Sequence, residues 1–488
     1  MAPSQSLKNK AIVGISALGI KRILLQFIFT FTNIFLARIL FPADFGTFAI
    51  VGSIIMFFSV FSDVGLTPAL IQKKGRLTVE DIRTAFTLQL ILGLLLLIIL
   101  NLFSGVIIKF FNLGTTGVGL LRLNSLIFLI NPFSLIPGAI LERNLSYKKI
   151  VIFDLARILV SSITSVSFAL SGFGVWSLLF GLLVAHVFGV FLFALFARWP
   201  MGIQISRKNL VSLANFGLPF QSNLVLGLFY GPLIMLYLGK KVGQENLGYF
   251  QFAASLSAFS LAVSDIINRI VFPLGSRLQH NKEFIRSIVE RAISIVSATS
   301  LPLVSMMLVA VPQIVHFVYT DKWLPAVPAL YFGIVQMGII AYTGILGQIL
   351  LALGHSKIMR NMGFVWAILT WIFGPILINR FNFVGMSMLG LLVSASGFWL
   401  LFKLKREVNF SFWNNFYPYF ASSILSVGFL IITKNFFGGS FLSFLLLLLS
   451  AGAVYSALIF YLRRDFVISN LKLAVEIFGG KFLSRNSK

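Results

Sequence analysis

The stretch LILGLLLLIIL at residues 90–100 decides the fold class of this chain. It shows neither the strict alternation of a membrane β-strand nor the polar face of a water-exposed helix. Apolar blocks of about 18–25 residues recur along the sequence between short polar turns, and each can cross a hydrocarbon layer of about 30 Å as a helix. The sequence therefore predicts an all-α integral membrane protein.

The apolar blocks predict about fourteen transmembrane helices. We place them near residues 12–37, 46–70, 85–109, 119–140, 150–171, 174–197, 210–238, 247–272, 292–317, 327–353, 362–379, 384–402, 417–437 and 441–462.

Composition supports this class. Of 488 residues, 58% are hydrophobic and only 11% are charged, with 39 Lys+Arg against 14 Asp+Glu and a formal net charge of +25. A soluble protein averages about 25% charged residues, so soluble and disordered classes are excluded. The basic residues lie between apolar blocks, which argues against nucleic-acid binding. They concentrate in alternate loops, and the positive-inside rule predicts that both termini are cytoplasmic.

An internal repeat is suggested by two segments at a constant offset of 202 residues. Gly46 aligns with Gly248, and Ser62-Asp63 aligns with Ser264-Asp265. An even number of spans separates them, so the repeats would be parallel about an axis along the membrane normal. We predict an N-lobe at residues 1–200, a C-lobe at 201–405, and two further helices with a basic cytoplasmic tail at 406–488. Two lobes around one cleft are typical of alternating-access transporters.

The segment Phe35–Phe86 resembles the N-terminal signature of bacterial polysaccharide transporters. These are Wzx-type flippases of the multidrug/oligosaccharidyl-lipid/polysaccharide exporter superfamily. The matching elements are Leu36-Ala37-Arg38, Pro42 to Phe45-Gly46, Phe61-Ser62-Asp63-Val64-Gly65-Leu66, Ala69-Leu70-Ile71-Gln72 and Leu77-Thr78 with Asp81.

The resemblance implies a V-shaped, two-lobed bundle with a basic central cavity. It implies a flippase that translocates undecaprenyl-pyrophosphate-linked oligosaccharide units across the bacterial inner membrane for O-antigen, capsule or exopolysaccharide biosynthesis. Membrane lipids and other polysaccharide-assembly proteins would be its partners. In the related lipid II flippases, arginines of the first helix line the cavity. The corresponding positions here fall at or near Gln26 and Thr32, so no residue is carried over.

Candidate cavity residues follow from the cargo. Arginine pairs with phosphate oxygens and amides pair with sugar hydroxyls, while a buried cation is costly without an anion or water. The substrate-binding candidates are Arg22, Gln26, Asn33, Arg122, Asn124, Arg157, Gln221, Asn223 and Arg269. Structural ion pairs remain the alternative: Arg22 with an acid of another helix, Arg157 with Asp154, and Arg269 with Asp265.

Asp63 and Asp265 are candidates for a gate or for ion coupling. Asp63 has no cation three or four residues away on its own helix. We therefore expect one of three roles for it: capping a neighbouring helix, forming a gate with an arginine, or carrying a coupling ion. The seventh span carries two expected hinges, Gly217 with Pro219 and Gly231 with Pro232, because proline kinks helices. Apart from possible coupling to H⁺ or Na⁺, we expect no cofactor, no metal and no catalytic residue.

Four alternative functions would each require a different pattern of residues in the sequence. A membrane glycosyltransferase or polymerase needs positioned carboxylates or metal ligands, and no Asp-x-Asp, HExxH or P-loop pattern occurs. A cationic-drug antiporter would favour acidic groups in its cavity. A lipid II flippase shares the charge pattern of our first choice. A passive scaffold would tolerate loss of the buried arginines.

Overall fold

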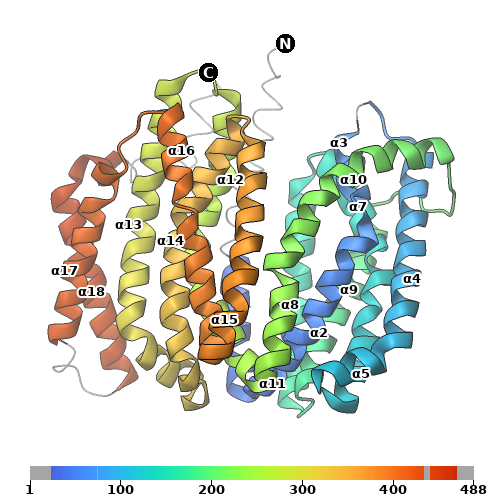
Figure 1. The fold of residues 1–488 in the computed structure, drawn as a ribbon, viewed down its shortest axis with the longest axis horizontal. Coiled ribbons are helices and arrows are strands. Elements are labelled where there is room, and N and C mark those ends of the chain that lie inside the picture. Colours follow the sequence, from blue (N-terminus) through green and yellow to red (C-terminus); the bar gives the residue numbers. More distant parts are fainter. Residues whose placement is uncertain (1–23, 74, 434–439, 470–488) are drawn as a thin grey trace. The chain divides into compact units, whose positions relative to one another are not determined.

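The computed structural model describes residues 24–73, 75–433 and 440–469, and every regular element in these ranges is helical (Figure 1). A first helix, Leu24–Ile39, precedes the labelled elements. The longer helices are α2 (Pro42–Asp63), α3 (Leu66–Gln72), α4 (Val79–Phe111), α5 (Gly114–Ser125), α6 (Ile127–Ile130), α7 (Pro132–Arg143), α8 (Tyr147–Leu170), α9 (Val175–Phe196), α10 (Arg207–Tyr230), α11 (Pro232–Ser257), α12 (Ala262–Arg277), α13 (Lys282–Ile314), α14 (Val327–Ala352), α15 (Ser356–Ser396), α16 (Trp399–Glu407), α17 (Tyr417–Thr433) and α18 (Phe441–Leu462). Short helical turns are η1 (Ala258–Leu261), η2 (Val315–Tyr319), η3 (Asp321–Ala326) and η4 (Trp413–Asn415).

Nine helical stretches in the described residues are long and apolar enough to cross a membrane, or up to ten if the bent pair of α5–α6 and α7 counts as one span. The helices Leu24–Ile39 and α17 are apolar but shorter. Large apolar side chains lie exposed on these helices; Leu102 of α4, for example, is 74% exposed. Such a surface is stable against lipid and unstable in water. The all-α membrane class is confirmed, whereas the count of fourteen stays a prediction.

The described chain forms two compact units. The first holds the residues up to Leu256 together with Val318–Phe332 and Arg360–Val393; the second holds Ser257–Phe317, Gly333–Met359 and the residues from Ser394 onward. The predicted lobe boundaries at residues 200 and 405 stay a prediction.

In the first unit, α2 and α11 cross at two glycines. A Cβ on Gly46 would overlap the backbone carbonyl oxygen of Gln244, and a Cβ on Gly248 would overlap that of Pro42. Only glycine allows two helix backbones to approach so closely. The contact is reciprocal at the offset of the predicted repeat, because Gln244 corresponds to Pro42 as Gly248 corresponds to Gly46. A two-fold relation between the segments would produce this exchange, which supports the repeat.

The end of α2 breaks at two left-handed residues. Val64 and Gly65 have φ of 47° and 75°, and α3 starts directly after them. A Cβ on Gly65 would overlap the backbone of Gly217 in α10, so a second glycine pair brings backbones together here.

The expected hinges are only partly seen. The α10 helix runs without a break through Gly217 and Pro219, so an interruption there is wrong, and Gly217 serves close packing against Gly65. The chain does break at Gly231, where the backbone leaves the helical region before Pro232 opens α11. Hinge motion at these residues stays a prediction, and the Pro219 side chain lies outside the described residues.

The linker between α9 and α10 is fastened to α4. The backbone N–H of Gln204 donates to Thr87 Oγ1 at 3.1 Å, and that of Ser206 donates to Thr84 Oγ1 at 3.1 Å. Arg83 Nε donates to the Pro200 carbonyl at 3.4 Å. The extended linker thus finds partners for its backbone along the side of α4.

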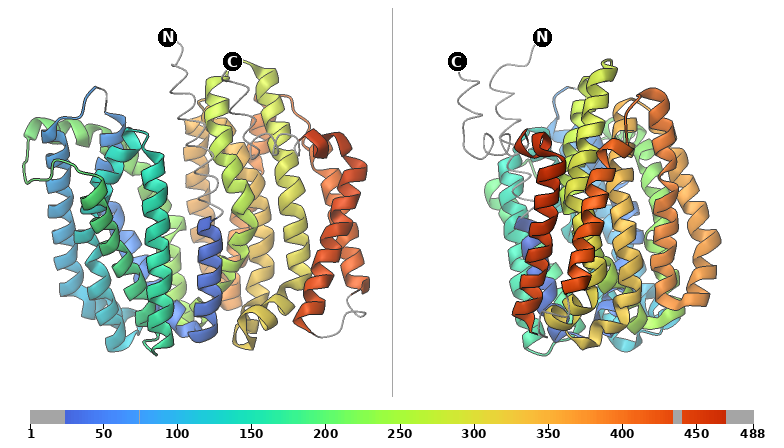
Figure 2. Two further views of the ribbon diagram at one scale, coloured as in Figure 1. Left: turned by 180° about the vertical axis from the view of Figure 1, so that it is seen from behind. Right: turned by 90° about the vertical axis from the view of Figure 1, so that its left-hand side faces the viewer.

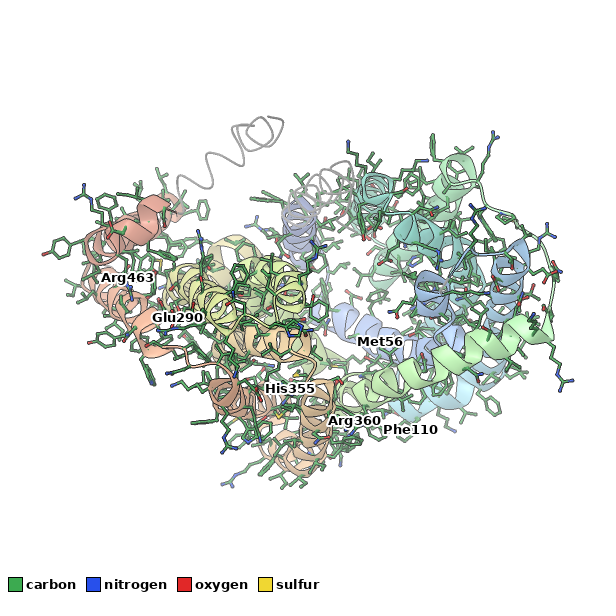
Figure 3. All side chains as sticks on the ribbon, turned by 90° about the horizontal axis from the view of Figure 1, so that it is seen from above. Met56, Phe110, Glu290, His355, Arg360 and Arg463 are labelled. Atoms are coloured by element: carbon green, nitrogen blue, oxygen red, sulfur yellow. The ribbon has the colours of Figure 1, made fainter. Side chains whose placement is uncertain are left out.

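In the second unit, α17 and α18 pack against α13 (Figures 1 and 2). Tyr455 of α18 donates to the Ala298 carbonyl at 2.9 Å, and Tyr342 of α14 donates to Ser297 Oγ at 3.0 Å. At one end of α13, Glu290 (labelled in Figure 3) accepts hydrogen bonds from Arg286 and from the Ser411 backbone. Hydroxyl groups inside this unit are therefore used to join helices.

Candidate functional site

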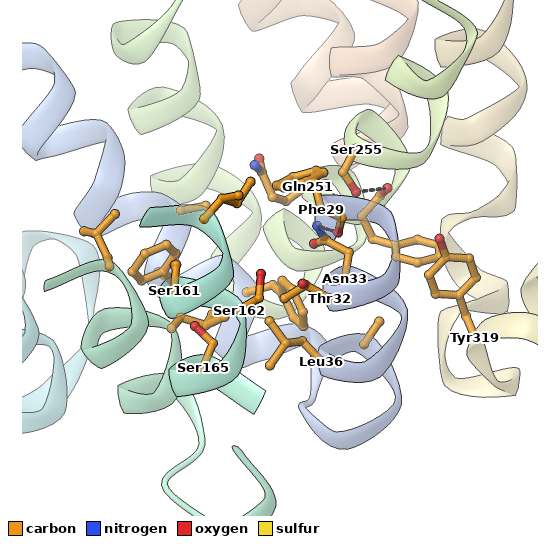
Figure 4. Close-up of a pocket in the computed structure, with 18 residues that line it drawn as sticks. Phe29, Thr32, Asn33, Leu36, Ser161, Ser162, Ser165, Gln251, Ser255 and Tyr319 are labelled. Atoms are coloured by element: carbon orange, nitrogen blue, oxygen red, sulfur yellow. Dashed lines mark hydrogen bonds between the residues drawn. The ribbon is translucent and has the colours of Figure 1, made fainter. Parts of the chain in front are cut away.

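A cavity of about 300 Å³, with a largely apolar wall that also carries uncharged polar side chains, opens among the helices of the first unit. The first helix, α2, α8, α9, α11 and the end of η2 contribute to its wall (Figure 4). Its polar lining residues are Thr32, Asn33, Ser161, Ser162, Ser165, Gln251, Ser255 and Tyr319, and its aromatic lining residues include Phe29, Phe45, Phe48 and Phe252. Of the described residues that line it, none carries a formal charge at neutral pH.

The first helix is held at its C-terminal end by the segment that carries Tyr319. Trp323 Nε1 donates to the Ala37 carbonyl at 2.8 Å, and Lys322 Nζ donates to the Arg38 carbonyl at 2.8 Å. The last carbonyls of a helix lack intrahelical partners, so these donors satisfy them. Arg38 returns a bond from Nε to the Val318 carbonyl at 2.8 Å. Through Ala37 and Arg38, two residues of the signature, the first helix is thus attached to the segment that carries Tyr319 and forms one wall of the cavity.

Trp323 is a core residue of this wall. It is fully buried and stacks on Phe252 with ring centroids 4.4 Å apart, while Phe252 meets Tyr319 edge-to-face at 4.9 Å. Such pairs add stability beyond the area they bury. The aromatic side of the cavity is therefore rigidly supported.

The opposite wall is the serine face of α8. Arg157, Ser161 and Ser165 are spaced by four residues, so they lie along one face of the helix. Ser165 fits against Gly181 of α9, where any Cβ would collide with its hydroxyl, and the Arg157 stem fits against Gly189 in the same way. Small residues of α9 therefore make room for the polar face of α8.

Many of the hydrogen-bonding groups in the cavity are unengaged. Thr32 and Asn33 donate to carbonyls of their own helix, at 2.7 and 2.8 Å, and Ser255 donates to Phe252 at 2.9 Å. Their oxygens remain free to accept further hydrogen bonds. Ser162 and Gln251 form no hydrogen bond with the residues that the structure describes, and Figure 4 shows Ser162 facing Thr32 across the cavity.

The predicted cavity residues divide into those near this site and those elsewhere. Asn33 lines the cavity, and Gln26 lies half-buried on the same helix outside the lining set. Arg22 lies outside the described residues, as do the side chains of Asn223 and Arg269. Sequence reasoning missed Thr32, the α8 serines, Gln251, Ser255 and Tyr319; the four-residue spacing of Ser161 and Ser165 was the available signal.

Arg122 and Asn124 belong to a different polar cluster between α4 and α5. Arg122 Nε donates to Ser104 Oγ at 2.8 Å, and Asn101 Nδ2 donates to Ser125 Oγ at 3.1 Å. Asn124 is 1% exposed, and its Oδ1 finds no partner among the described residues. Neither Arg122 nor Asn124 lines the cavity, and their role in substrate binding stays a prediction.

Arg157 is the predicted cation that lies nearest to the cavity along α8, one turn before Ser161. It is half-buried, and its Nε is buried with no hydrogen-bond partner among the described residues. A guanidinium N–H without a partner is costly in a membrane interior, unless water or an anion satisfies it. Asp154, three residues earlier on α8, attracts this guanidinium electrostatically, so binding of an anionic group by Arg157 and its pairing with Asp154 both stay predictions.

Asp63 caps α3. Its Oδ1 accepts hydrogen bonds from Thr67 N at 3.0 Å and from Thr67 Oγ1 at 2.7 Å, and it also accepts from the amide of Gln89. The first backbone N–H groups of a helix need such an acceptor. Gln221 of α10 donates to the Val60 carbonyl of α2 beside this junction. The capping alternative for Asp63 is thus observed, and ion coupling stays a prediction.

Asp265 lies half-buried on α12 of the second unit. Its neighbour Asn268 has a buried Oδ1 that finds no partner among the described residues. Across the described ranges, no group of three or more His, Asp or Glu is placed to hold a metal ion. The gating role of Asp265 stays a prediction.

These features define the class: a multi-pass, all-helical membrane protein with a cavity between its helices that carries uncharged polar side chains. The family model described as "Polysaccharide biosynthesis protein" matches residues 35–328. The chain therefore belongs to this polysaccharide biosynthesis protein family, which confirms the resemblance predicted from the Phe35–Phe86 signature.

Individual relatives agree with this assignment. The chain is 25% identical over 476 residues to an uncharacterized membrane protein in the cps region of Klebsiella pneumoniae, covering 91% of this chain and 92% of that protein. It is 23% identical over 328 residues to the lipopolysaccharide biosynthesis protein WzxC of Escherichia coli (strain K12), covering 67% of this chain and 66% of the relative.

Solved structures show the same fold. The lipid II flippase MurJ in an inward closed conformation matches 93% of this chain and 100% of its own, with a TM-score of 0.78 at 16% identity. An inward-facing multidrug resistance transporter of the MATE family, from the MOP superfamily, matches 80% of this chain and 98% of its own, with a TM-score of 0.62 at 14% identity. By name these proteins are a flippase and a transporter, in agreement with the prediction that the chain is not an enzyme.

Proposed function

We propose that this protein is a flippase that translocates a polyprenyl-pyrophosphate-linked oligosaccharide across the bacterial inner membrane by alternating access, for surface polysaccharide biosynthesis. The observation that carries this proposal is the family match over residues 35–328. The fold shared with a lipid II flippase supports it, because such a fold already handles a sugar attached to a lipid pyrophosphate.

The chemistry of the first unit fits such a cargo. An oligosaccharide presents many hydroxyl groups, and the cavity offers amide and hydroxyl partners for them. A pyrophosphate carries about two negative charges, and Arg157 lies half-buried one turn from the serine face. We expect energy coupling to H⁺ or Na⁺ and no bound cofactor.

Two rivals within transport remain to be separated by experiment. The MurJ fold favours lipid II as an alternative cargo. A cationic-drug antiporter would need acidic groups around its ligand, and no Asp or Glu occurs among the described residues that line the cavity. The cavity therefore favours a glycan over a cation.

Complementation in two hosts tests the proposal. One host lacks its own oligosaccharide flippase, and the other is depleted of its lipid II flippase. We expect this chain to restore surface polysaccharide in the first host when that host's glycan matches, and to leave the second arrested. Rescue of the second host alone would overturn the assignment in favour of lipid II. Rescue of neither host, with the protein present in the membrane, would count against both assignments.

The proposed orientation places both termini in the cytoplasm. Because the sequence contains no Cys, single cysteines can be labelled without background. An impermeant thiol reagent added to intact spheroplasts should label Ser171→Cys, between α8 and α9, and leave Arg76→Cys, between α3 and α4, unmodified. Labelling in the reverse order would invert the topology.

A further inference from the structure

We propose that the cavity in the first unit is a subsite for one neutral sugar residue of the transported glycan, and that it discriminates against charged sugars. This inference rests on the proposed function and adds which part of the cargo the cavity receives. At about 300 Å³ it lies at the lower end of the range for small-molecule sites, roughly 300–1,000 Å³. That size fits a single sugar ring better than a whole oligosaccharide.

The polar groups suit hydroxyl recognition. A sugar hydroxyl is both a donor and an acceptor, so it needs partners that can play either part. Asn33 retains its Oδ1 and a second N–H after donating to the Phe29 carbonyl, and Thr32 retains its acceptor sites. Ser162 and Gln251, which form no hydrogen bond to any residue the structure describes, can donate and accept. These groups come from three helices and converge on one space (Figure 4).

The aromatic groups suit the other face of a sugar. A pyranose ring presents C–H groups on one side, and these pack against flat apolar surfaces. Phe252 is fixed by stacking on the buried Trp323, and Tyr319 is fixed edge-on against Phe252. An aromatic wall opposite a hydroxyl wall is an arrangement that orients a ring with one polar and one apolar side.

Because no charged side chain occurs among the described residues that line the cavity, we expect the cavity to favour neutral sugars over charged ones. A carboxylate or a phosphate placed among these described lining residues would lose its water without gaining a counter-charge. An ammonium group on an amino sugar would meet the same penalty. The pyrophosphate of the cargo must then lie outside the cavity, and Arg157, one turn along α8 from Ser161, is the nearest candidate on that helix to receive it.

The test measures binding of three polyprenyl-pyrophosphate lipids to the full-length protein in nanodiscs. One lipid carries a single neutral hexose, the second carries the corresponding hexuronic acid, and the third carries no sugar. We expect the hexose lipid to bind at least tenfold more tightly than either of the others. Equal affinity for the hexose and hexuronate lipids, or no gain over the sugar-free lipid, would overturn the inference.

Variants locate the effect. Asn33→Leu and Gln251→Met keep the side-chain volume and remove hydrogen-bonding groups, and each should reduce the affinity for the hexose lipid about tenfold while the affinity for the sugar-free lipid stays unchanged. Ser456→Ala, on an exposed site of α18, is the control and should change neither affinity. Equal weakening of all three lipids would mean that the cavity holds the pyrophosphate or the polyprenyl chain, which would overturn the sugar assignment.

The proposed function fails on a different result. If the two-host complementation shows no polysaccharide export while the hexose preference persists in nanodiscs, the sugar subsite stands and flipping is refuted. If export is restored and no sugar preference is found, flipping stands and the subsite is refuted.

Discussion

Helices α2 and α11 form the glycine crossing and also contribute to the wall of the cavity, and the polar groups of these two regions have opposite roles. At the crossing, Thr47 donates to Gln244 at 2.6 Å, and glycines close the remaining space. In the cavity, Gln251 and Ser162 have no hydrogen-bond partner among the described residues. Groups that are paired within the chain hold the fold, and groups left unpaired beside a space are available to a ligand. Substitutions in the two regions should therefore separate stability from transport.

The largest effect is expected at the crossing. Gly46→Ala should cost more than about 4 kcal/mol of stability, because its methyl group would overlap backbone that cannot move aside. Fluorescence-detected size-exclusion chromatography should show little monodisperse protein.

Gly52 provides the matched control on the same helix. A Cβ there meets nothing within 4 Å, so Gly52→Ala should leave the elution profile unchanged. Normal yield of Gly46→Ala would show that α2 and α11 can separate at no cost.

A smaller effect is expected at the α3 cap. Asp63→Ala removes the acceptor for Thr67 and should lower the free energy of unfolding by about 1–3 kcal/mol. Thermal unfolding in detergent measures this loss.

Asp63→Asn separates capping from ion coupling. Its amide oxygen can still accept from Thr67, so most of the stability and the transport rate should remain. A stable Asp63→Asn protein that has lost transport would indicate that the carboxylate carries a proton or an ion.

A third substitution extends the comparison to the second unit. Tyr455→Phe removes a single hydrogen bond to the Ala298 carbonyl and should lower stability by about 1 kcal/mol without changing transport. Thermal unfolding and a proteoliposome flipping assay report the two quantities. A transport defect at unchanged stability would show that hydroxyls of this unit also serve function.

The smallest effect on stability is expected in the cavity. Ser162→Ala breaks no hydrogen bond to a described residue and should change the free energy of unfolding by less than about 0.5 kcal/mol. Flipping of a pyrophosphate-linked glycan should nevertheless slow several-fold. If stability falls and flipping does not, Ser162 is a packing residue.

Much of the fold could be predicted because the bilayer demands long apolar helices, and the predicted blocks fall mainly on helical residues where the structure describes them, with breaks such as those at Val64-Gly65 and Gly231. The number of spans was harder to settle. Gly243 and Asn382 have non-helical backbone inside α11 and α15, and both lie in the turns that the sequence predicts between successive spans. The polar turns thus indicate where the chain bends, but they do not fix whether the helix continues through the bend or ends there.

The candidate site was less predictable. Among the described cavity candidates, Asn33 lines the cavity, whereas Arg122, Asn124 and Gln221 lie outside its lining, with Arg122 bonded to Ser104 and Gln221 to the Val60 carbonyl. The sequence prediction gave weight to charge, because a buried charge is expensive and so informative. The cavity uses serine, threonine and amides, which are common in membrane helices and carry little signal. Tyr319 joins the site only through the docking of its segment on the first helix.

The fastening of the 200–206 linker to α4 has a mechanical consequence. Thr84 and Thr87 accept hydrogen bonds from two backbone N–H groups of the connection between α9 and α10. Without these bonds, the connection would be held less firmly against α4 at this point. Because this connection is short, a movement of α10 would either displace the adjoining end of α4 or first break these two hydrogen bonds. Inserting a few glycines between Ser206 and Arg207 would lengthen the connection between these bonds and α10 while leaving the residues that line the cavity unchanged.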